Sequence, residues 1–432
     1  MDANTIRAKH KQFLFPNVSN FYSESLVPVK AQGMSVWDSE GKKYLDFFAG
    51  ILTVSVGHCN PKVVEETAAQ LRTLGHVSTL YPTEPIVRMA EKMASLAPAH
   101  PAGWKLMFTS SGSEANETSI LTAKVATGAQ DMIALRHSYG GRTATALNMM
   151  GHKSYRPRGS EIPGIKHAHA PYCYRCDFGL TYPSCEMRCA KDIETLIQTE
   201  TSGAVACFIA EPIMGVGGFI TPPKEYFQVA VPIIKKYGGL FIADEVQTGF
   251  GRTGNHMWGI DNYGVTPDIM SFAKGIANGA PVGATMAKAE LADKQTYSSI
   301  ATFGGNPVSM IQALATLSVI ENERLVENSK VVGGYLRDGL NALAERFTQI
   351  GEVRGMGLMQ ALELVKDRKT KEPDPQGANR LMEATRKRGL LIGKGGLYGN
   401  VMRIAPPMIA TKGDVDDALK ILGESLGESA TA

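Results

Sequence analysis

Residues 204–246 contain three successive runs, AVACFIAEPI (204–213), EYFQVAVPIIKKYG (225–238) and GLFIADEV (239–246). The first and third runs are apolar throughout instead of alternating, as in strands that are buried on both faces of a parallel sheet. The middle run has the length of a helix. A strand, a helix and a strand in this order predict a βαβ unit.

The same alternation continues on both sides of this unit. WKLMFTS (104–110) and DMIALRHS (131–138) predict two earlier strands, and SEANETSILTAKVATG (113–128) predicts the helix between them. DIMSFAKG (268–275) predicts one more strand. The fold class that we predict is therefore α/β, with helices on both faces of a mainly parallel sheet.

The two ends of the chain show another pattern. GMSVWDSEGKKYLDFFAGI (33–51) predicts a hairpin that turns at SEGKK, and residues 325–347 predict a long helix. Short strand-like pieces follow that helix: GLMQALEL (357–364), GLLIGKG (389–395) and VMRIAPP (401–407). We predict a large domain over residues 61–325 and a smaller α+β domain that combines residues 1–60 with residues 326–432.

The composition is that of an ordinary globular protein. Of the 432 residues, 44% are hydrophobic and 20% are charged. A net charge of +3 is too small to indicate nucleic-acid binding. No apolar run approaches the roughly 20 residues that cross a bilayer, and the apolar stretch near the N-terminus is too short for a secretory signal. We predict a cytoplasmic protein that binds neither nucleic acid nor membranes.

Four of the six cysteines, Cys173, Cys176, Cys185 and Cys189, lie close together in residues 151–190, a segment rich in Pro, Gly and Cys that we predict to be a long loop. Thiolates at this spacing can converge on zinc or an iron–sulfur cluster. The alternative is a surface loop with free thiols in a reducing compartment. Because the second pair lacks the usual C-x₂-C repetition, we predict no bound metal.

Polar residues follow three of the predicted strands. Ser111-Gly112-Ser113 follows KLMFT, Asp244 ends LFIAD, and Lys274 follows MSFA. In parallel α/β sheets, ligands bind beyond the carboxyl ends of the strands. We therefore expect these residues to face one crevice.

Lys274 and Asp244 have the chemistry of a cofactor site. Burial at a strand end disfavours the ammonium form of Lys274, which lowers its pKa and makes a nucleophilic amine. The alternative is a lysine that extends to solvent. Asp244 is costly to bury without a partner, and it can also be a metal ligand or a helix cap. No G-x-x-x-x-G-K-[ST] sequence is present, so a P-loop ATPase is not supported.

The Ser111-Gly112-Ser113 segment opens a predicted helix. The free N–H groups and positive dipole of a helix N-terminus suit a phosphate group. The alternative is simple capping by Ser113 with Asn116 and Glu117. Thr302 offers another hydroxyl beside a glycine turn. Together these residues supply an amine, a carboxylate and a phosphate cradle.

Six motifs carry a family resemblance: SSGSEANE (110–117), IAEPIMGVGG (209–218), LFIADEVQTGFGRTG (240–254), SFAKG (271–275), TFGGNP (302–307) and MRIAPP (402–407). Their identity and order resemble the class III (ω-amino acid) aminotransferases, nearly from end to end of the chain. The resemblance implies fold type I of the pyridoxal-phosphate (PLP) enzymes and pyridoxal 5′-phosphate as cofactor. It also implies a ping-pong transamination between an amino donor and a 2-oxo acid acceptor.

The resemblance implies roles around the cofactor. Lys274 matches the lysine that forms the Schiff base and moves a proton between cofactor and substrate. Asp244 matches the carboxylate at the pyridine nitrogen, and Gln247 matches the group near the ring hydroxyl. Gly112 and Ser113 match the pair that binds the phosphate.

Two further matches concern the shape of the site. Tyr139 matches the aromatic residue that stacks on the cofactor ring, but Gly140 stands where the family usually has histidine. Thr302 matches a threonine that reaches the phosphate from the neighbouring subunit. This implies a homodimer or a dimer of dimers with shared active sites.

The resemblance also identifies residues for the substrate. Arg403 matches the arginine that binds a carboxylate, for which a guanidinium fork is suited. Glu211 matches the glutamate that can pair with that arginine. Arg142 matches an arginine for the distal carboxylate of 4-aminobutyrate, with a structural salt bridge as the alternative. Ile51 lies where the family narrows the pocket.

The segments PYCYRCDFGLTYPSC and GLLIGKGGLYGNV are most similar to the alanine–glyoxylate and β-amino acid branch. This implies β-alanine, 3-aminoisobutyrate or 4-aminobutyrate as donor and pyruvate or glyoxylate as acceptor. A phospholyase that acts on a phosphorylated amino alcohol is the alternative, with cations from residues 155–158. A non-catalytic PLP-binding protein is disfavoured by the intact lysine, aspartate and arginine. A dehydrogenase lacks its G-x-G-x-x-G motif.

Overall fold

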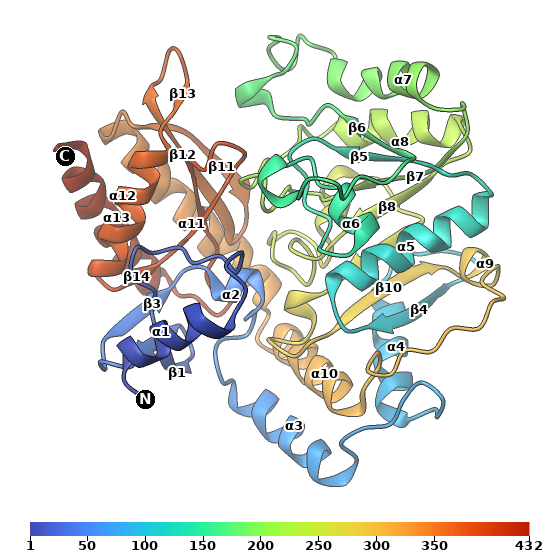
Figure 1. The fold of residues 1–432 in the computed structure, drawn as a ribbon, viewed down its shortest axis with the longest axis horizontal. Helices are drawn as coiled ribbons and strands as arrows, with labels where there is room; N and C mark the ends of the chain where they lie inside the picture. The colour runs from blue at the N-terminus through green and yellow to red at the C-terminus, as the bar shows by residue number, and fades with distance from the viewer. Residues whose placement is uncertain (432) are drawn as a thin grey trace.

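The computed structural model describes residues 1–431, and it describes side chains as far as residue 428. Its largest sheet has seven strands in the order β4-β10-β9-β8-β7-β5-β6 (Figure 1). Their bounds are Trp104–Thr109 (β4), Asp131–Leu135 (β5), Ile165–Ala168 (β6), Val205–Ala210 (β7), Leu240–Asp244 (β8), Ile269–Phe272 (β9) and Gly283–Lys288 (β10). Strand β10 runs antiparallel to both of its neighbours, and the other pairs in this sheet are parallel.

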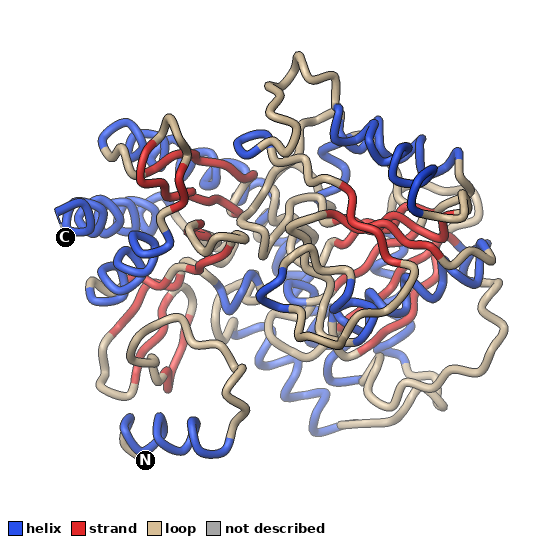
Figure 2. Tube along the Cα trace, turned by 45° about the horizontal axis from the view of Figure 1, so that its top comes forward, coloured by secondary structure: helices blue, strands red, loops and turns tan. Residues whose placement is uncertain are grey.

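Helices cover both faces of this sheet, as predicted (Figure 1 and Figure 2). Helix α5 packs along β4, β7, β8, β9 and β10, whereas α8 packs against β7, β8 and α7. The helices of the chain as far as β10 are Ala3–Phe13 (α1), Ala49–Leu52 (α2), Pro61–Thr73 (α3), Glu84–Leu96 (α4), Gly112–Thr127 (α5), Ala144–Asn148 (α6), Arg188–Glu200 (α7) and Tyr226–Lys236 (α8). Those after β10 are Ala289–Ala292 (α9), Pro307–Asn322 (α10), Leu325–Arg346 (α11), Pro375–Lys387 (α12) and Lys412–Thr431 (α13). Four short 3₁₀ turns are Lys153–Tyr155, Cys173–Arg175, Gly259–Tyr263 and Lys274–Ile276.

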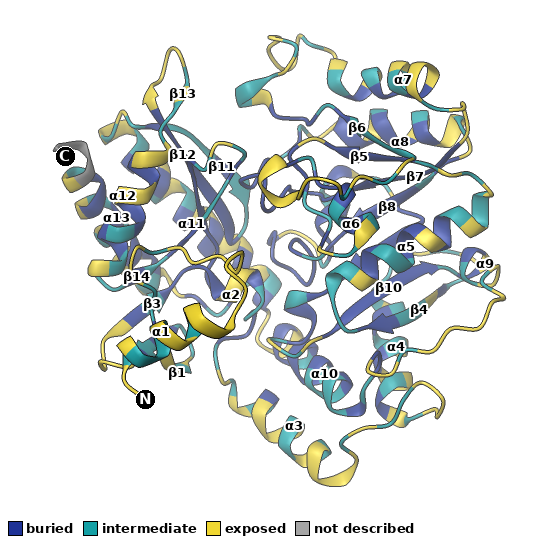
Figure 3. Ribbon diagram, viewed as in Figure 1, coloured by how far each residue is buried: buried dark blue, intermediate teal, exposed yellow. Residues whose placement is uncertain are grey.

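The central strands are buried, which agrees with their continuous apolar runs. Every residue of β7 and β9 is buried, and Figure 3 shows the central strands of this sheet mainly in the buried colour. The edge strand β6 differs. It lies inside residues 151–190, where we predicted a long loop, and its sequence IKHA has no continuous apolar run. Its pairing with β5 organises part of that loop.

Two smaller sheets form the other half of the molecule. The predicted hairpin is present as β2 (Ser35–Asp38) and β3 (Lys43–Asp46), which lie in the sheet β1-β2-β3-β14. The remaining strands are Pro28–Gln32 (β1), Ile350–Met356 (β11), Met359–Asp367 (β12), Glu372–Pro373 (β13), Leu390–Leu391 (β14), Gly393–Gly395 (β15) and Val401–Ile404 (β16). Strands β11, β12, β16 and β15 form the second sheet in that order, and β13 pairs with β12.

The two chain ends share one sheet, because Leu390 in β14 pairs in parallel with Leu45 in β3. The N- and C-termini also lie on the same side of the molecule (Figure 1). The division of the chain at residues 60 and 325 stays a prediction, and this pairing supports it.

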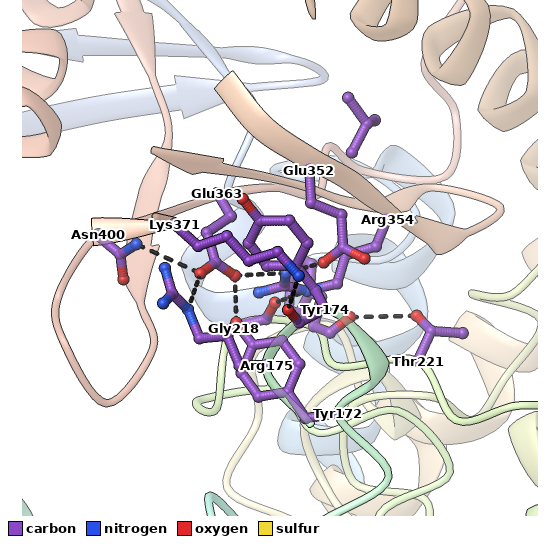
Figure 4. A network of polar contacts seen from close by, with 12 residues as sticks. Tyr172, Tyr174, Arg175, Gly218, Thr221, Glu352, Arg354, Glu363, Lys371 and Asn400 are labelled. Carbon is purple, nitrogen blue, oxygen red and sulfur yellow. Dashed lines mark hydrogen bonds and ion pairs between the residues drawn. The ribbon is translucent and has the colours of Figure 1, made fainter. Parts of the chain in front are cut away.

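A buried polar network ties the cysteine-rich segment to the second sheet (Figure 4). Its centre is Glu363, whose side chain has no exposed surface. The carboxylate accepts hydrogen bonds from the Tyr172 hydroxyl, from Arg175 Nε at 2.5 Å and from Arg354 Nη1 at 2.6 Å. Burial alone raises the pKa of a carboxyl, but Arg354 and the Tyr172 hydroxyl hold the pKa of Glu363 below its ordinary value. Glu363 is therefore an ionised group that depends on these donors.

Replacing Glu363 with glutamine is expected to lower the free energy of unfolding by about 3–5 kcal/mol, since it leaves buried guanidinium groups without their carboxylate. Glu352 provides a matched control. Its side chain is 28% exposed and has Arg354 as its one ion-pair partner among the described residues, so Glu352→Gln should cost about 1 kcal/mol or less. Urea denaturation of both variants measures the difference. Equal losses would contradict the central position of Glu363.

Candidate active site

The carboxyl ends of the parallel strands surround a cavity of about 170 Å³. Eight of the predicted site residues line it: Gly112, Ser113, Tyr139, Arg142, Glu211, Asp244, Gln247 and Lys274. The single crevice expected from the strand ends is therefore present. Arg403, Ile51 and Thr302 are not part of its lining.

Lys274 follows β9 and opens into this cavity. Its backbone has a φ of 50°, a left-handed conformation that residues other than glycine adopt at a cost in free energy. Among the described residues, its ammonium group has no hydrogen bond or ion pair. Burial lowers the pKa of Lys274, and the nearby Asp244 and Glu211 oppose that shift. The residue thus has the properties of a nucleophilic amine.

Asp244 ends β8 and is held by two donors. Its Oδ1 accepts from the backbone N–H of Val246 at 3.0 Å, and its Oδ2 accepts from Asn116 Nδ2 at 2.8 Å. The Asn116 amide also donates to the Gly140 carbonyl at 2.7 Å and accepts from the Ser271 hydroxyl at 2.6 Å. Asn116 is thus not the helix cap that we considered for it. It fixes the orientation of the carboxylate.

Helix α5 points its N-terminus at the cavity. Ser111 is its N-cap, and the Ser111 hydroxyl accepts from the Glu114 backbone N–H at 3.3 Å. This arrangement leaves the N–H groups of Gly112 and Ser113 without an acceptor within the described chain. A helix N-terminus of this kind binds phosphate groups.

The packing of the chain explains why position 140 is a glycine. A Cβ atom there would lie 2.4 Å from the Ala146 carbonyl oxygen, because α6 packs directly on it. A histidine at this position would displace α6. Tyr139 keeps its place beside the cavity, where its backbone N–H donates to Glu211 and its ring packs edge-on against Tyr155 at 5.5 Å.

Glu211 and Arg403 do not form the pair that the resemblance suggested. Each Glu211 oxygen accepts a backbone N–H instead, from Tyr139 at 2.9 Å and from Gly215 at 2.8 Å. Arg403 donates to the carbonyl oxygens of Lys394 at 3.2 Å and Gly215 at 3.5 Å. Gly215 therefore contacts both side chains, since its N–H donates to Glu211 and its carbonyl oxygen accepts from Arg403.

Glu211→Gln is expected to remove a pH dependence of stability. Burial, and then the charge of Asp244, raise the pKa of Glu211 from 4.5 to about 8. The folded protein therefore keeps a proton that the unfolded chain releases above about pH 4.5, so this contribution to stability is lost as the pH rises toward 8. The melting temperature of the wild type relative to Glu211→Gln should fall between about pH 5 and pH 8. If the difference between the two melting temperatures stays constant over this pH range, the raised pKa of Glu211 is contradicted.

The remaining predicted residues lie nearer the surface. The Arg142 side chain is exposed and has no ion pair among the described residues, which contradicts the structural salt bridge that we considered. Ile51 is 42% exposed, Thr302 is exposed in the segment before α10, and residues 155–158 are exposed.

The clustered cysteines are thiols in this structure. Burial raises the pKa of Cys173 to about 11 and that of Cys189 to about 12, so both are protonated near neutral pH. Over residues 1–431, no three His, Cys, Asp or Glu side chains are arranged to hold a metal ion.

The cavity fits pyridoxal phosphate. Gln247 Oε1 is a buried acceptor without a hydrogen-bond donor in the described chain, and a ring hydroxyl supplies one. Asp244 is a buried carboxylate suited to a protonated ring nitrogen, and the free N–H groups of Gly112 and Ser113 suit a phosphate. The amine of Lys274 lies in the same cavity.

Comparisons with known proteins agree with this arrangement. The model of the family "Aminotransferase class-III" matches residues 18–426. The chain is 42% identical over 427 residues to alanine–glyoxylate aminotransferase 2 homolog 2, mitochondrial, of Arabidopsis thaliana, covering 99% of this chain and 88% of that protein. It is 37% identical to human alanine–glyoxylate aminotransferase 2, mitochondrial, covering 98% and 86%. An (S)-enantioselective omega-transaminase from Thermomicrobium roseum superimposes with a TM-score of 0.91 at 34% identity, covering 99% of both chains.

Within the described residues, no helix has both the length and the apolar character needed to span a membrane.

Proposed function

Because the chain belongs to the class III aminotransferase family, we propose that it transfers the amino group of an ω- or β-amino acid to pyruvate or glyoxylate. The protein is a transaminase, and its cofactor is pyridoxal phosphate. The proposed donors are β-alanine, 3-aminoisobutyrate and 4-aminobutyrate, in a ping-pong reaction whose two halves use the same residues. The names of the Arabidopsis and human relatives support glyoxylate as an acceptor.

Lys274 is the proposed attachment point of the cofactor and the carrier of the proton. Pyridoxal phosphate supplies, when bound, a carbonyl group that takes up the amine and a ring that accepts an electron pair. The lowered pKa of Lys274 favours the neutral amine, which can remove a proton from the substrate carbon and return it as the reaction proceeds. Asp244 holds the proton on the ring nitrogen, and Asn116 keeps its carboxylate in position.

The other predicted residues orient the two reactants. The N–H groups of Gly112 and Ser113 bind the cofactor phosphate, Gln247 binds the ring hydroxyl, and Tyr139 covers the ring. Because these residues line the same cavity as Lys274, such contacts would bring the reactants to its amine.

On the substrate side, Arg403 binds a carboxylate. Arg142 lines the same cavity and would bind a second carboxylate. Ile51, which is 42% exposed and lies outside the cavity lining, would narrow the approach to it. Glu211 lines the same cavity and is held by its two backbone hydrogen bonds.

The proposed active unit is a homodimer, in which Thr302 reaches the phosphate bound by the partner. Residues 79–81 lie against the segment around Thr302, since the Thr79 hydroxyl donates to the Ala301 carbonyl at 3.2 Å. Four large apolar side chains there are each more than three-fifths exposed: Leu80, Tyr81, Ile300 and Phe303. Apolar surface of this kind is normally covered by a partner. The cytoplasmic location remains a prediction.

The observation that carries this proposal is the convergence of Lys274, Asp244 and the N-terminus of α5 on one cavity. A half-reaction panel tests it. Enzyme with bound cofactor is mixed with β-alanine, 4-aminobutyrate, L-alanine or phosphoethanolamine, without an acceptor, while the cofactor absorbance is recorded. The ω- and β-amino acids should change the absorbance, and pyruvate or glyoxylate should restore it. If no amine changes it, transamination is wrong. Release of inorganic phosphate from phosphoethanolamine would identify a phospholyase.

A further inference from the structure

The Arg403 guanidinium lies over two aromatic rings, those of Phe48 and Phe219. Arg403 is part of β16, where every residue is buried, and the whole residue is 3% exposed. Its guanidinium carbon is 4.8 Å from the ring centre of Phe48 and 5.8 Å from that of Phe219. Both distances lie within the roughly 6 Å over which a cation is attracted to the face of a ring.

Phe48 is itself held in place. Strand β15 lies directly against its ring, because a Cβ atom at Gly393 would be 2.1 Å from the Phe48 ring. The ring of Phe21 packs on it at 5.7 Å. Phe48 is 8% exposed, so its ring has little room to move.

Phe219 is held by its backbone. It has a φ of 53°, and the preceding Gly218 carbonyl accepts a hydrogen bond from Arg354 Nε at 2.8 Å. Arg354 belongs to the Glu363 network, whose contact with Gly218 appears in Figure 4. The ring of Phe219 has no exposed surface. The polar network therefore anchors the segment that presents this ring to Arg403.

The close packing continues along the arginine side chain. A Cβ atom at Gly395 would lie 3.0 Å from Arg403 Nε, so only glycine leaves space at that point. The two hydrogen bonds of Arg403 to Lys394 and Gly215 use two of the five N–H groups of a guanidinium. The other three N–H groups have no acceptor among the described residues. Arg403 is also close enough to Lys274 to influence its charge.

From this geometry we propose that Phe48 and Phe219 are positioning residues that clamp Arg403 as a fixed receptor for a substrate carboxylate. This inference rests on the proposed function, in which Arg403 binds that carboxylate. The clamp holds the guanidinium plane before the substrate arrives, so that little freedom is lost on binding. It therefore favours reactants that carry a carboxylate over amines that do not.

The test compares substitutions that remove or keep the aromatic face. Phe48→Leu and Phe219→Leu should each raise KM for β-alanine and for pyruvate by roughly 2- to 30-fold, the range set by cation–π interactions. The kcat of both variants should stay within about 3-fold, and kcat/KM for propylamine should stay within about 2-fold. Phe48→Tyr keeps the ring and should retain a KM close to that of the wild type.

Phe227→Leu is the matched control, because Phe227 is fully buried and packs on Tyr226, Phe241 and Tyr263. Phe227→Leu should leave KM for β-alanine and pyruvate, kcat, and kcat/KM for propylamine within about 2-fold of the wild type. The clamp is wrong if Phe48→Leu changes kcat/KM for β-alanine and for propylamine by the same factor. It is also wrong if Phe227→Leu raises KM for β-alanine as much as Phe48→Leu does.

A binding measurement separates this inference from the proposed function. Propionate carries the carboxylate but no amino group, and calorimetry with the holoenzyme gives its dissociation constant without turnover. The clamp predicts that Phe48→Leu and Phe219→Leu weaken propionate binding by the same factor as KM for β-alanine. Unchanged propionate binding would overturn the clamp. A wild-type enzyme that binds propionate but turns over no amino acid would overturn the proposed function alone.

Discussion

Lys274→Ala should lower kcat by about 10⁴-fold or more, the largest effect that we expect from any single substitution. The variant loses the amine that attaches the cofactor and the group that moves the proton, and positioned acid–base groups alone contribute up to about 10⁴-fold. The Lys274 amine has no hydrogen bond or ion pair to a described residue, so its removal breaks no such contact of the fold. A normal fold and an inactive enzyme are expected together.

The covalent role has its own measurement. Borohydride reduction of the wild-type holoenzyme, followed by peptide mass spectrometry, should place the cofactor on the peptide that contains Lys274. Lys274→Ala should show no modified lysine. Lys224→Ala, at an exposed position, is the control and should keep both the modified peptide and the activity. A modified peptide elsewhere in Lys274→Ala, with retained activity, would overturn the assignment.

Asp244→Asn should weaken cofactor binding by roughly 30- to 5,000-fold, the effect of truncating one partner of a buried, hydrogen-bonded charge pair. Asparagine has nearly the same shape and can still accept from the Val246 N–H. However, its amide would oppose Asn116 Nδ2, which already donates to Asp244 Oδ2. The ring nitrogen would then lose its carboxylate, and kcat at saturating cofactor should fall as well.

Glu245→Gln is the matched control for this effect. Glu245 is the adjacent buried carboxyl, but its oxygens accept from the Thr248 hydroxyl and from the N–H groups of Gly259 and Ile260. This substitution should lower the melting temperature and leave the dissociation constant of the cofactor within about 2-fold. Titration of the cofactor-free proteins measures both constants. If Glu245→Gln weakens binding as much as Asp244→Asn, the special role of Asp244 is refuted.

The parts of the site that could be predicted are those that depend on local sequence. Lys274 directly follows a buried strand, Asp244 ends one, and Gly112 opens the helix after β4; parallel strands bring such residues to one edge. The apolar runs of β7, β8 and β9 identified those strands. Strand β6 escaped notice because an edge strand with partly exposed side chains needs no continuous apolar run.

Other parts depend on contacts between distant segments. Asn116 looked like a capping residue, and only the packing of α5 across β8 brings its amide to Asp244. Glu363 lies in an apolar run with no local sign that a tyrosine and two arginines converge on it. No ion pair joins Glu211 to Arg403 in this structure, because the backbone N–H groups of Tyr139 and Gly215 already bind the glutamate. Their pairing when a substrate lacks a carboxylate stays a prediction.

The pairing of β14 with β3 has a consequence for the newly made chain. Leu45 and its partner Leu390 are separated by 390 − 45 = 345 residues. At about 5–20 residues per second, the ribosome needs roughly 20–70 s to make the chain between them. During that time the inner edge of β3 has its free N–H and C=O groups open to any other strand. The strands of the β1-β2-β3-β14 sheet emerge in their spatial order, but the sheet is complete only after Leu390 has been made. The N-terminal hairpin therefore lacks its β14 partner until nearly the whole protein has been made.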